Sequence, residues 1–230
     1  MKDTPIYINS KDRYSYLKKL IDQLERLGTT NIIIMDTGST WPPMLEYYET
    51  LKYPIVRLGN VPTDAQHALW NYNVLNRFGH EAAWFVYTDC DVVPVEDCPS
   101  DYLDFMHEAL MKFPQMVKIG FGLKINDIPE HYQHKYTKPG KDPRYNPGIL
   151  DWETQFWSAP IGEHLFEAPI DTTFALYRPG VRGYSAQRAI RTGCPYCERH
   201  LTWYTNSSNP TEEELYYKAH VVPNVSSWEL

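Results

Sequence analysis

Short apolar runs alternate with segments of helical periodicity through the N-terminal part of the chain. The runs that read as buried strands are Pro5–Ile8, Asn31–Met35, Pro54–Leu58 and Trp84–Tyr87. Between them, apolar residues recur at helical spacing from Leu17 to Gly28, from Pro43 to Leu51 and from Ala68 to Phe78. Strands that alternate with helices are typical of a parallel, doubly wound sheet. The pattern therefore predicts an α/β fold with a Rossmann-like, mostly parallel central sheet flanked by helices.

Polar loops follow these strands, at Asn9–Arg13, Asp36–Thr40 and Asp89–Asp91. Ligands of open α/β sheets bind outside the carboxyl ends of the strands. Asp89 and Asp91, one residue apart, can share a divalent cation or divide their roles between a cation and a sugar hydroxyl. By itself the tripeptide is a weak signal, because a solvated turn has the same sequence. No glycine-rich phosphate loop occurs at any of these turns.

Composition limits the kinds of molecule that the chain is expected to bind. The chain has 230 residues and a formal net charge of −7, which disfavours binding to a nucleic-acid polymer or to an anionic membrane. The N-terminal residues precede no apolar region of a signal peptide, and no apolar stretch is long enough to span a membrane. We therefore expect a soluble, cytoplasmic protein.

The second half of the chain is less regular. The strand expected over Met116–Ile125 carries Gly120 and Gly122 on one face, which predicts a close approach to the backbone there. Residues 126–150 are aperiodic and rich in Pro and Gly, so they are either a mobile flap over a bound ligand or an irregular surface excursion. Without a repeat or a linker, we expect a single domain over residues 1–230, with one half at about 1–125 and a second half at about 126–230.

Cys194, Cys197 and His200 have a spacing that superficially suggests zinc. A fourth ligand is not evident, and the strand context of a redox-active CxxC is missing. We interpret the two cysteines as ordinary thiols.

Taken together, the ordered motifs resemble the nucleotide-sugar-dependent glycosyltransferases of the GT-A fold. The resemblance covers most of the chain and rests on Asn9–Arg13, Asp36–Thr40, Tyr87–Asp91, the segment at Asp171 and Arg199–Tyr204. It implies a nucleotide half joined to a smaller, mixed acceptor half. It also implies a divalent cation, Mn²⁺ or Mg²⁺, that bridges the donor diphosphate.

By this resemblance, three residues bind the nucleotide. Asp36 would accept a hydrogen bond from the base, most often uracil, although it can equally close an Asx turn. Asn9 and Arg13 would line the same pocket, although Asn9 can also cap the first helix.

The resemblance assigns the metal site and the base as well. Asp91 would bind the cation, Asp89 would bind the ribose or a metal-bound water, and His200 would complete the metal site. Asp171 would face the acceptor hydroxyl as general base in an inverting enzyme, or would orient substrates in a retaining one. The competing carboxylates are Glu153, Glu163 and Glu167.

The predicted function is metal-dependent transfer of a glycosyl group from a nucleoside diphosphate sugar, with a UDP-sugar as the expected donor, to a hydroxyl acceptor on a glycan or small molecule. A sugar nucleotidyltransferase should carry a glycine-rich basic loop after the first strand, and residues 9–13 contain no glycine. A third alternative is a binding module without catalysis.

Overall fold

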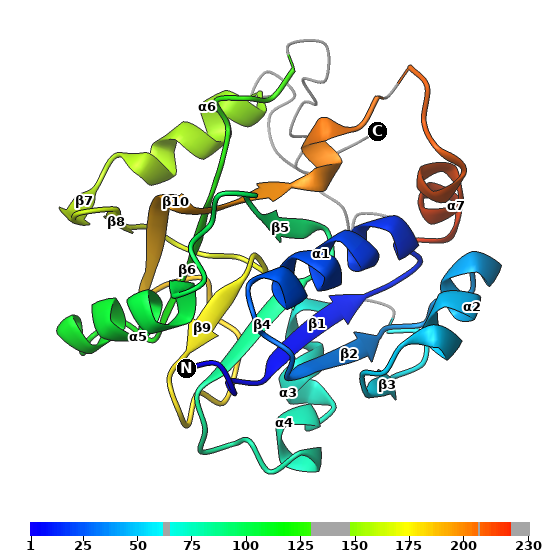
Figure 1. Cartoon of the computed structure of the whole chain (residues 1–230), viewed down its shortest axis with the longest axis horizontal. Helices are drawn as coiled ribbons and strands as arrows, with labels where there is room; N and C mark the ends of the chain where they lie inside the picture. Colours follow the sequence, from blue (N-terminus) through cyan, green and yellow to red (C-terminus); the bar gives the residue numbers. More distant parts are fainter. Residues whose placement is uncertain (62–64, 130–147, 207, 222–230) are drawn as a thin grey trace.

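The computed structural model describes residues 1–61, 65–129, 148–206 and 208–221, which form an α/β fold around one mixed sheet (Figure 1). The N-terminal half alternates strands and helices as the sequence predicts. Its elements are β1 (Ile6–Ser10), α1 (Tyr14–Arg26), β2 (Ile32–Asp36), α2 (Pro42–Thr50), β3 (Ile55–Arg57), the 3₁₀ turn η1 (Ala65–His67), α3 (Ala68–Asn71), α4 (Val74–Arg77) and β4 (Phe85–Asp89).

The rest of the described chain adds strands to the same sheet. Its elements are β5 (Val92–Pro94), α5 (Tyr102–Lys112), β6 (Lys118–Leu123), α6 (Ile149–Thr154), η3 (Gln155–Trp157), β7 (Pro160–Gly162), β8 (Leu165–Glu167), β9 (Ala175–Tyr177), β10 (Ala189–His200), η4 (Leu201–Tyr204) and α7 (Glu212–His220).

The order of the strands places a topological switch point between β1 and β4. They follow the order β3-β2-β1-β4-β9-β6-β10-β8-β7, and β5 pairs with β10. The core β3-β2-β1-β4 is parallel, whereas β9 runs antiparallel to both β4 and β6. The chain winds outward from β1 to β3 and then returns to the other side of β1 with β4. The carboxyl ends of β1 and β4 therefore flank a topological switch point, where ligands of open sheets bind.

Helices cover both faces of the parallel core (Figure 1). Residues of α1, α2 and α5 pack with Ile8, Val86 and Phe121 on one face. Residues of α3 and α4 pack with Tyr7 and Tyr87 on the other. The strands are consequently buried on both sides, which explains their continuous apolar sequence.

The helix expected from Ala68 to Phe78 is broken. Tyr72 and Asn73 separate α3 from α4, and Asn73 has a left-handed conformation with φ of 49°. Asparagine tolerates this conformation better than most residues, so the break has a local cause that apolar spacing does not reveal.

The prediction of ordinary thiols for Cys194 and Cys197 is wrong, because the two sulfurs form a disulfide. The chain bulges where β10 shifts its register against β6, between Thr192 and Cys197. The bulge brings the Cα atoms of the two cysteines to 4.7 Å, within the range of a disulfide. A pair of thiolate ligands for zinc is thereby excluded. Cys90 and Cys98 are buried free thiols.

The two predictions for the middle of the chain have different outcomes. Gly120 and Gly122 are approached closely, since an added Cβ would lie 2.2 Å from the Phe174 carbonyl oxygen or 2.5 Å from that of Thr192. The proposed flap over 126–150 falls mainly on residues 130–147, which lie outside the described residues.

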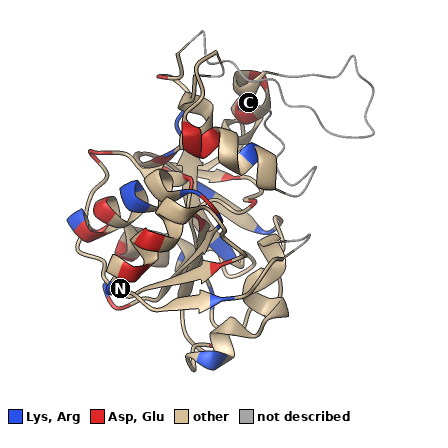
Figure 2. Cartoon of the chain, turned by 90° about the vertical axis from the view of Figure 1, so that its right-hand side faces the viewer, with Lys and Arg blue, Asp and Glu red and all other residues tan. Residues whose placement is uncertain are grey.

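Among the described residues, no helix is long and apolar enough to cross a membrane. In the view of Figure 2, acidic residues are interspersed with Lys and Arg rather than gathered apart from them.

Candidate functional site

The first contact of the candidate site joins the carboxyl ends of β1 and β4. Asn9 and Asp89 are register partners in the parallel pair. The Asn9 Nδ2 donates a hydrogen bond of 3.0 Å to Asp89 Oδ1, and Asn9 Oδ1 is buried without a partner among the described residues. Asn9 does not cap α1, because the N-cap position is Arg13. The structure thus brings the predicted residues Asn9 and Asp89 together.

Asp89 sits in an environment that disfavours its negative charge. Burial, followed by the charge of Asp91, raises the pKa of Asp89 to about 8. Hydrogen bonds from Asn9 and from the Thr172 side chain oppose this rise. The Asp89 amide also donates to the Thr172 carbonyl at 2.9 Å, which ties the segment after Asp171 to the end of β4. A cation at this point would relieve the repulsion between the two aspartates.

His200 meets the Asp89–Asp91 turn although it lies far along the sequence. The antiparallel pairing of β5 with β10 sets His200 opposite Val92, the residue after Asp91. The Leu201 amide then donates a hydrogen bond of 2.7 Å to the Asp91 carbonyl. Burial lowers the pKa of His200, and the charge of Asp91 opposes that shift. A neutral imidazole therefore lies within the electrostatic reach of Asp91.

The His200 ring is held in place by its neighbours. Its Nδ1 is hydrogen-bonded to the Thr202 hydroxyl, and the ring stacks on Trp203 with centroids 4.9 Å apart. The described residues supply no hydrogen-bond partner for Nε2. A fixed, neutral ring with one engaged nitrogen is typical of a histidine ligand.

Arg13 is a buried cation next to the same turn. The residue is 5% exposed, and its guanidinium carbon lies 3.7 Å from the centre of the Tyr217 ring. Burial acts to lower the pKa of Arg13, but Tyr217 and Asp91 outweigh this and leave it raised. Among the described residues, Nε and Nη1 have no hydrogen-bond partner, and no carboxylate forms an ion pair with the guanidinium. Such a group is suited to an anionic ligand.

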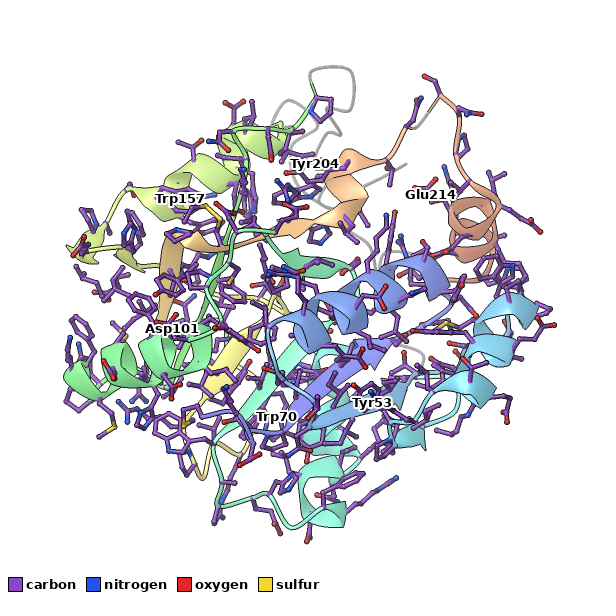
Figure 3. All side chains as sticks on the ribbon, viewed as in Figure 1. Tyr53, Trp70, Asp101, Trp157, Tyr204 and Glu214 are labelled. Atoms are coloured by element: carbon purple, nitrogen blue, oxygen red, sulfur yellow. A yellow bond between two sulfur atoms is a disulfide. The ribbon has the colours of Figure 1, made fainter. Side chains whose placement is uncertain are left out.

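Helix α7 carries Tyr217, whose ring stacks on the Arg13 guanidinium. A capping box of Thr211 and Glu214 begins the helix. Glu214, labelled in Figure 3, accepts a hydrogen bond of 3.1 Å from the Tyr16 hydroxyl, and Glu213 accepts one of 2.9 Å from the Ser15 amide. The C-terminal helix is thereby fastened to the start of α1.

Asp171 is exposed and lies within electrostatic reach of Asp89 and His200. Its charge raises the pKa of Asp89 and opposes the lowering of the pKa of His200. The Tyr184 hydroxyl donates a hydrogen bond to Asp171 Oδ1. Lys118 Nζ lies 3.4 Å from the Asp171 carbonyl oxygen. The carboxylate is thus oriented by protein groups and open to solvent.

Asp36 has protein partners for both of its oxygens. Oδ1 accepts from the Ser39 amide at 2.9 Å, and Oδ2 accepts from Arg57 at 3.1 Å. Asp36 therefore stabilises the turn that follows β2. Base recognition by Asp36 stays a prediction.

The three carboxylates that compete with Asp171 for the role of general base differ in burial and in their contacts. Glu153 is buried in an ion pair with Arg191, and burial raises its pKa to about 7. Glu163 and Glu167 are exposed on the β7–β8 hairpin. In the described part of the chain, none of these three carboxylates contacts Asp89 or Asp91, whereas the charge of Asp171 acts on Asp89.

The strand pairings bring the backbone of Asp89, Asp91 and His200 to the same end of the sheet. Over residues 1–61, 65–129, 148–206 and 208–221, however, no group of three or more His, Cys, Asp or Glu side chains lies close enough together to hold a metal ion. The donor set nevertheless fits Mn²⁺ or Mg²⁺, which accept carboxylate oxygens and keep positions for water and phosphate.

Sequence reasoning missed Lys118, Tyr184 and Tyr217. Lys118 could have been recognised from the sequence, because a lysine inside an apolar strand needs buried hydrogen-bond partners. Tyr184 lies in an irregular segment between β9 and β10, and Tyr217 lies in the short helix α7, where no sequence motif marks it.

Comparison with models of protein families finds no match, and comparison with curated proteins finds none either. Among solved structures, a chain described as "Crystal Structure of a Mycobacterial Protein" is similar, with 12% sequence identity and a TM-score of 0.45. The match covers 86% of this chain and 66% of that chain. Likeness at this level supports no inference about function.

Proposed function

We propose that the protein is a metal-dependent glycosyltransferase that uses a nucleoside diphosphate sugar, with a UDP-sugar as the first donor to test. The observation that carries the proposal is the convergence of Asn9, Asp89, Asp91, Asp171 and His200 at the switch point between β1 and β4. These residues come from four separate parts of the sequence. The strand ends at such a switch point are where ligands of open α/β sheets bind.

Asp91, Asp89 and His200 would hold the cation. A bound Mn²⁺ or Mg²⁺ supplies positive charge that stabilises the departing diphosphate. Asn9 supports this arrangement from β1, since its Nδ2 orients Asp89 Oδ1 at 3.0 Å. Thr202 does the same for the His200 ring through Nδ1.

Arg13 would bind the diphosphate from the side of α7. Its two unpartnered donors match phosphate oxygens, and its charge adds to that of the cation on the leaving group. Tyr217 restrains the guanidinium by stacking, so little side-chain freedom remains to be lost on binding.

Asp171 would orient the acceptor hydroxyl and, in an inverting reaction, take its proton. The position of Asp171 supports this role, because an exposed carboxylate close to Asp89 can contact an acceptor that binds next to the donor.

A panel of nucleotide sugars tests the proposal. Thermal unfolding is measured for each donor with Mn²⁺ and with chelator, and each stabilising donor is then assayed for transfer and for hydrolysis. We expect a nucleoside diphosphate sugar to raise the melting temperature only with Mn²⁺. The Asp171→Asn variant should bind that donor but transfer about 10²- to 10⁴-fold more slowly.

Two results would contradict the proposal. Binding without transfer or hydrolysis under any metal would favour a non-catalytic binding module. Stabilisation by nucleoside triphosphate and sugar phosphate, with release of pyrophosphate, would favour a nucleotidyltransferase.

A further inference from the structure

Asp171 is connected to two residues that are absent from the cation and donor site. Tyr184 lies in the segment between β9 and β10, and Lys118 is the first residue of β6. Both approach Asp171, one at its carboxylate and the other at its backbone.

Tyr184 fixes the carboxylate. Its hydroxyl donates to Asp171 Oδ1, and its ring meets His67 edge to face at a centroid distance of 5.1 Å. The ring also lies 5.2 Å from the Lys118 ammonium. A phenol held on two sides offers its hydrogen bond in one direction, which leaves Asp171 Oδ2 for another partner.

Lys118 fixes the backbone that carries Asp171. The residue is 0% exposed, although lysine is seldom fully buried. Its Nζ donates to the Ile170 carbonyl at 2.7 Å and to the Tyr177 hydroxyl at 3.1 Å, and lies 3.4 Å from the Asp171 carbonyl. No carboxylate of the described residues forms an ion pair with it. The donors of this lysine are thus directed at the strand-like segment that ends on Asp171.

The same segment touches the metal-side aspartate. The Asp89 amide donates to the Thr172 carbonyl at 2.9 Å. A displacement of residues 170–172 would therefore move Asp171 relative to Asp89.

We propose that Tyr184 and Lys118 are positioning residues that hold Asp171 against the donor site, Tyr184 through the carboxylate and Lys118 through the backbone. The inference rests on the proposed role of Asp171 in transfer. It extends that role by making the geometry of the acceptor carboxylate depend on a buried lysine and on a tyrosine outside the crevice.

The central test compares Tyr184→Phe with Tyr53→Phe. Tyr53, labelled in Figure 3, also donates to a carboxylate, Glu25 Oε1 at 2.6 Å, so the control removes the same kind of hydrogen bond elsewhere. For Tyr184→Phe we expect kcat for transfer to fall about 10- to 100-fold, because small misplacements of reacting groups have effects of this size. The Kd of the donor with Mn²⁺ should change less than about twofold. Tyr53→Phe should keep the wild-type kcat.

A double variant shows whether Tyr184 acts through Asp171. In an Asp171→Asn background, Tyr184→Phe should cause no further loss of kcat, because the group that it positions is already disabled. A further loss of the full size, or a wild-type kcat in Tyr184→Phe alone, would overturn the proposal.

Hydrogen exchange supplies a readout that does not need transferase activity. Lys118→Met and Tyr184→Phe should each speed exchange of the Asp89 amide, whose acceptor is in the positioned segment, while core amides of β2 keep their protection. If the wild-type protein transfers no sugar, the proposed function fails, but this measurement still decides whether the segment is positioned. Unchanged exchange at Asp89 in both variants would overturn the inference. If Lys118→Met does not fold, Tyr184→Phe alone decides the outcome.

Discussion

Arg13 shows how a single residue links fold and ligand. A buried guanidinium with two unpartnered donors is costly unless an anion completes it, and Asp91 acts on it only from beyond ion-pair distance. The charge is buried beside the Asp89–Asp91 turn rather than at the surface. In the proposed function, a phosphate of the donor would be that anion.

Replacement of Arg13 by Met should weaken the binding of nucleoside diphosphate by about 1.5–3 kcal/mol, the usual contribution of hydrogen bonds to a charged group. The loss should persist in chelator, because the contact does not run through the cation. Calorimetry with the Arg26→Met variant provides the control, since Arg26 lies exposed in the last turn of the same helix. Equal affinities in the two variants would contradict a phosphate role for Arg13.

Lys118 gives the stability of the protein a characteristic pH dependence. Burial lowers its pKa from the ordinary value of 10.5 to about 7, with Asp171 opposing and Arg191 adding to the shift. Between these two values the unfolded chain binds more protons than the folded one, so the free energy of unfolding increases with pH. The slope should reach at most about 1.4 kcal/mol per pH unit.

Urea unfolding at several pH values from about 7 to 10 checks this prediction. Lys118→Met should flatten the slope, and Lys112→Met, which changes an exposed residue, should keep it. The same slope in Lys118→Met and wild type would show that Lys118 does not titrate in this window.

At the scale of elements, β6 is shaped by its glycines. Phe174 passes so close that its carbonyl oxygen would lie 2.2 Å from a Cβ on residue 120. That oxygen also accepts the Phe121 amide at 3.1 Å and cannot withdraw without breaking the sheet. The glycine therefore allows β9 to pair closely with β6, next to the segment of Asp171.

Gly120→Ala should destabilise the protein by about 1–3 kcal/mol or more, as overpacking does in well-packed cores. Gly183→Ala is the matched control, because an added Cβ there meets no atom within 4 Å. Denaturant midpoints of the two variants should differ accordingly. A midpoint for Gly120→Ala equal to that of the control would contradict the close approach.

The sequence predicts which segments form strands better than it predicts which strands pair with one another. The strands that end at Ser10, Asp36 and Asp89 are marked by local apolar runs followed by polar residues. The insertion of β9 between β4 and β6 depends on distant pairing, which no local pattern encodes. The disulfide of Cys194 and Cys197 was missed for a related reason, because the spacing alone does not reveal the bulge that brings the sulfurs together.

The candidate site is partly predictable for the same reason. Asp89 and Asp91 stand at a recognisable strand end, whereas His200 was assigned by resemblance and is brought to them by the pairing of β5 with β10. Tyr184 could not be assigned, since its partner Asp171 lies across an irregular segment.

At the scale of the whole molecule, the sheet gathers the ends of distant segments at one edge. The β1 loop, the end of β4, the Asp171 segment and the end of β10 meet there, and α7 closes over Arg13 from the C-terminal side. The central claim is that this meeting point binds a nucleotide sugar through a divalent cation.

Calorimetric titration of a UDP-sugar, with Mn²⁺ and with excess chelator, tests that claim most directly. Wild type and Asp97→Asn, which alters an exposed aspartate in the segment after β5, should bind the donor with Mn²⁺ and lose at least about tenfold in affinity with chelator. Asp91→Asn should bind weakly and equally in both conditions. Equal donor affinity of the wild-type protein with Mn²⁺ and with chelator would contradict the claim.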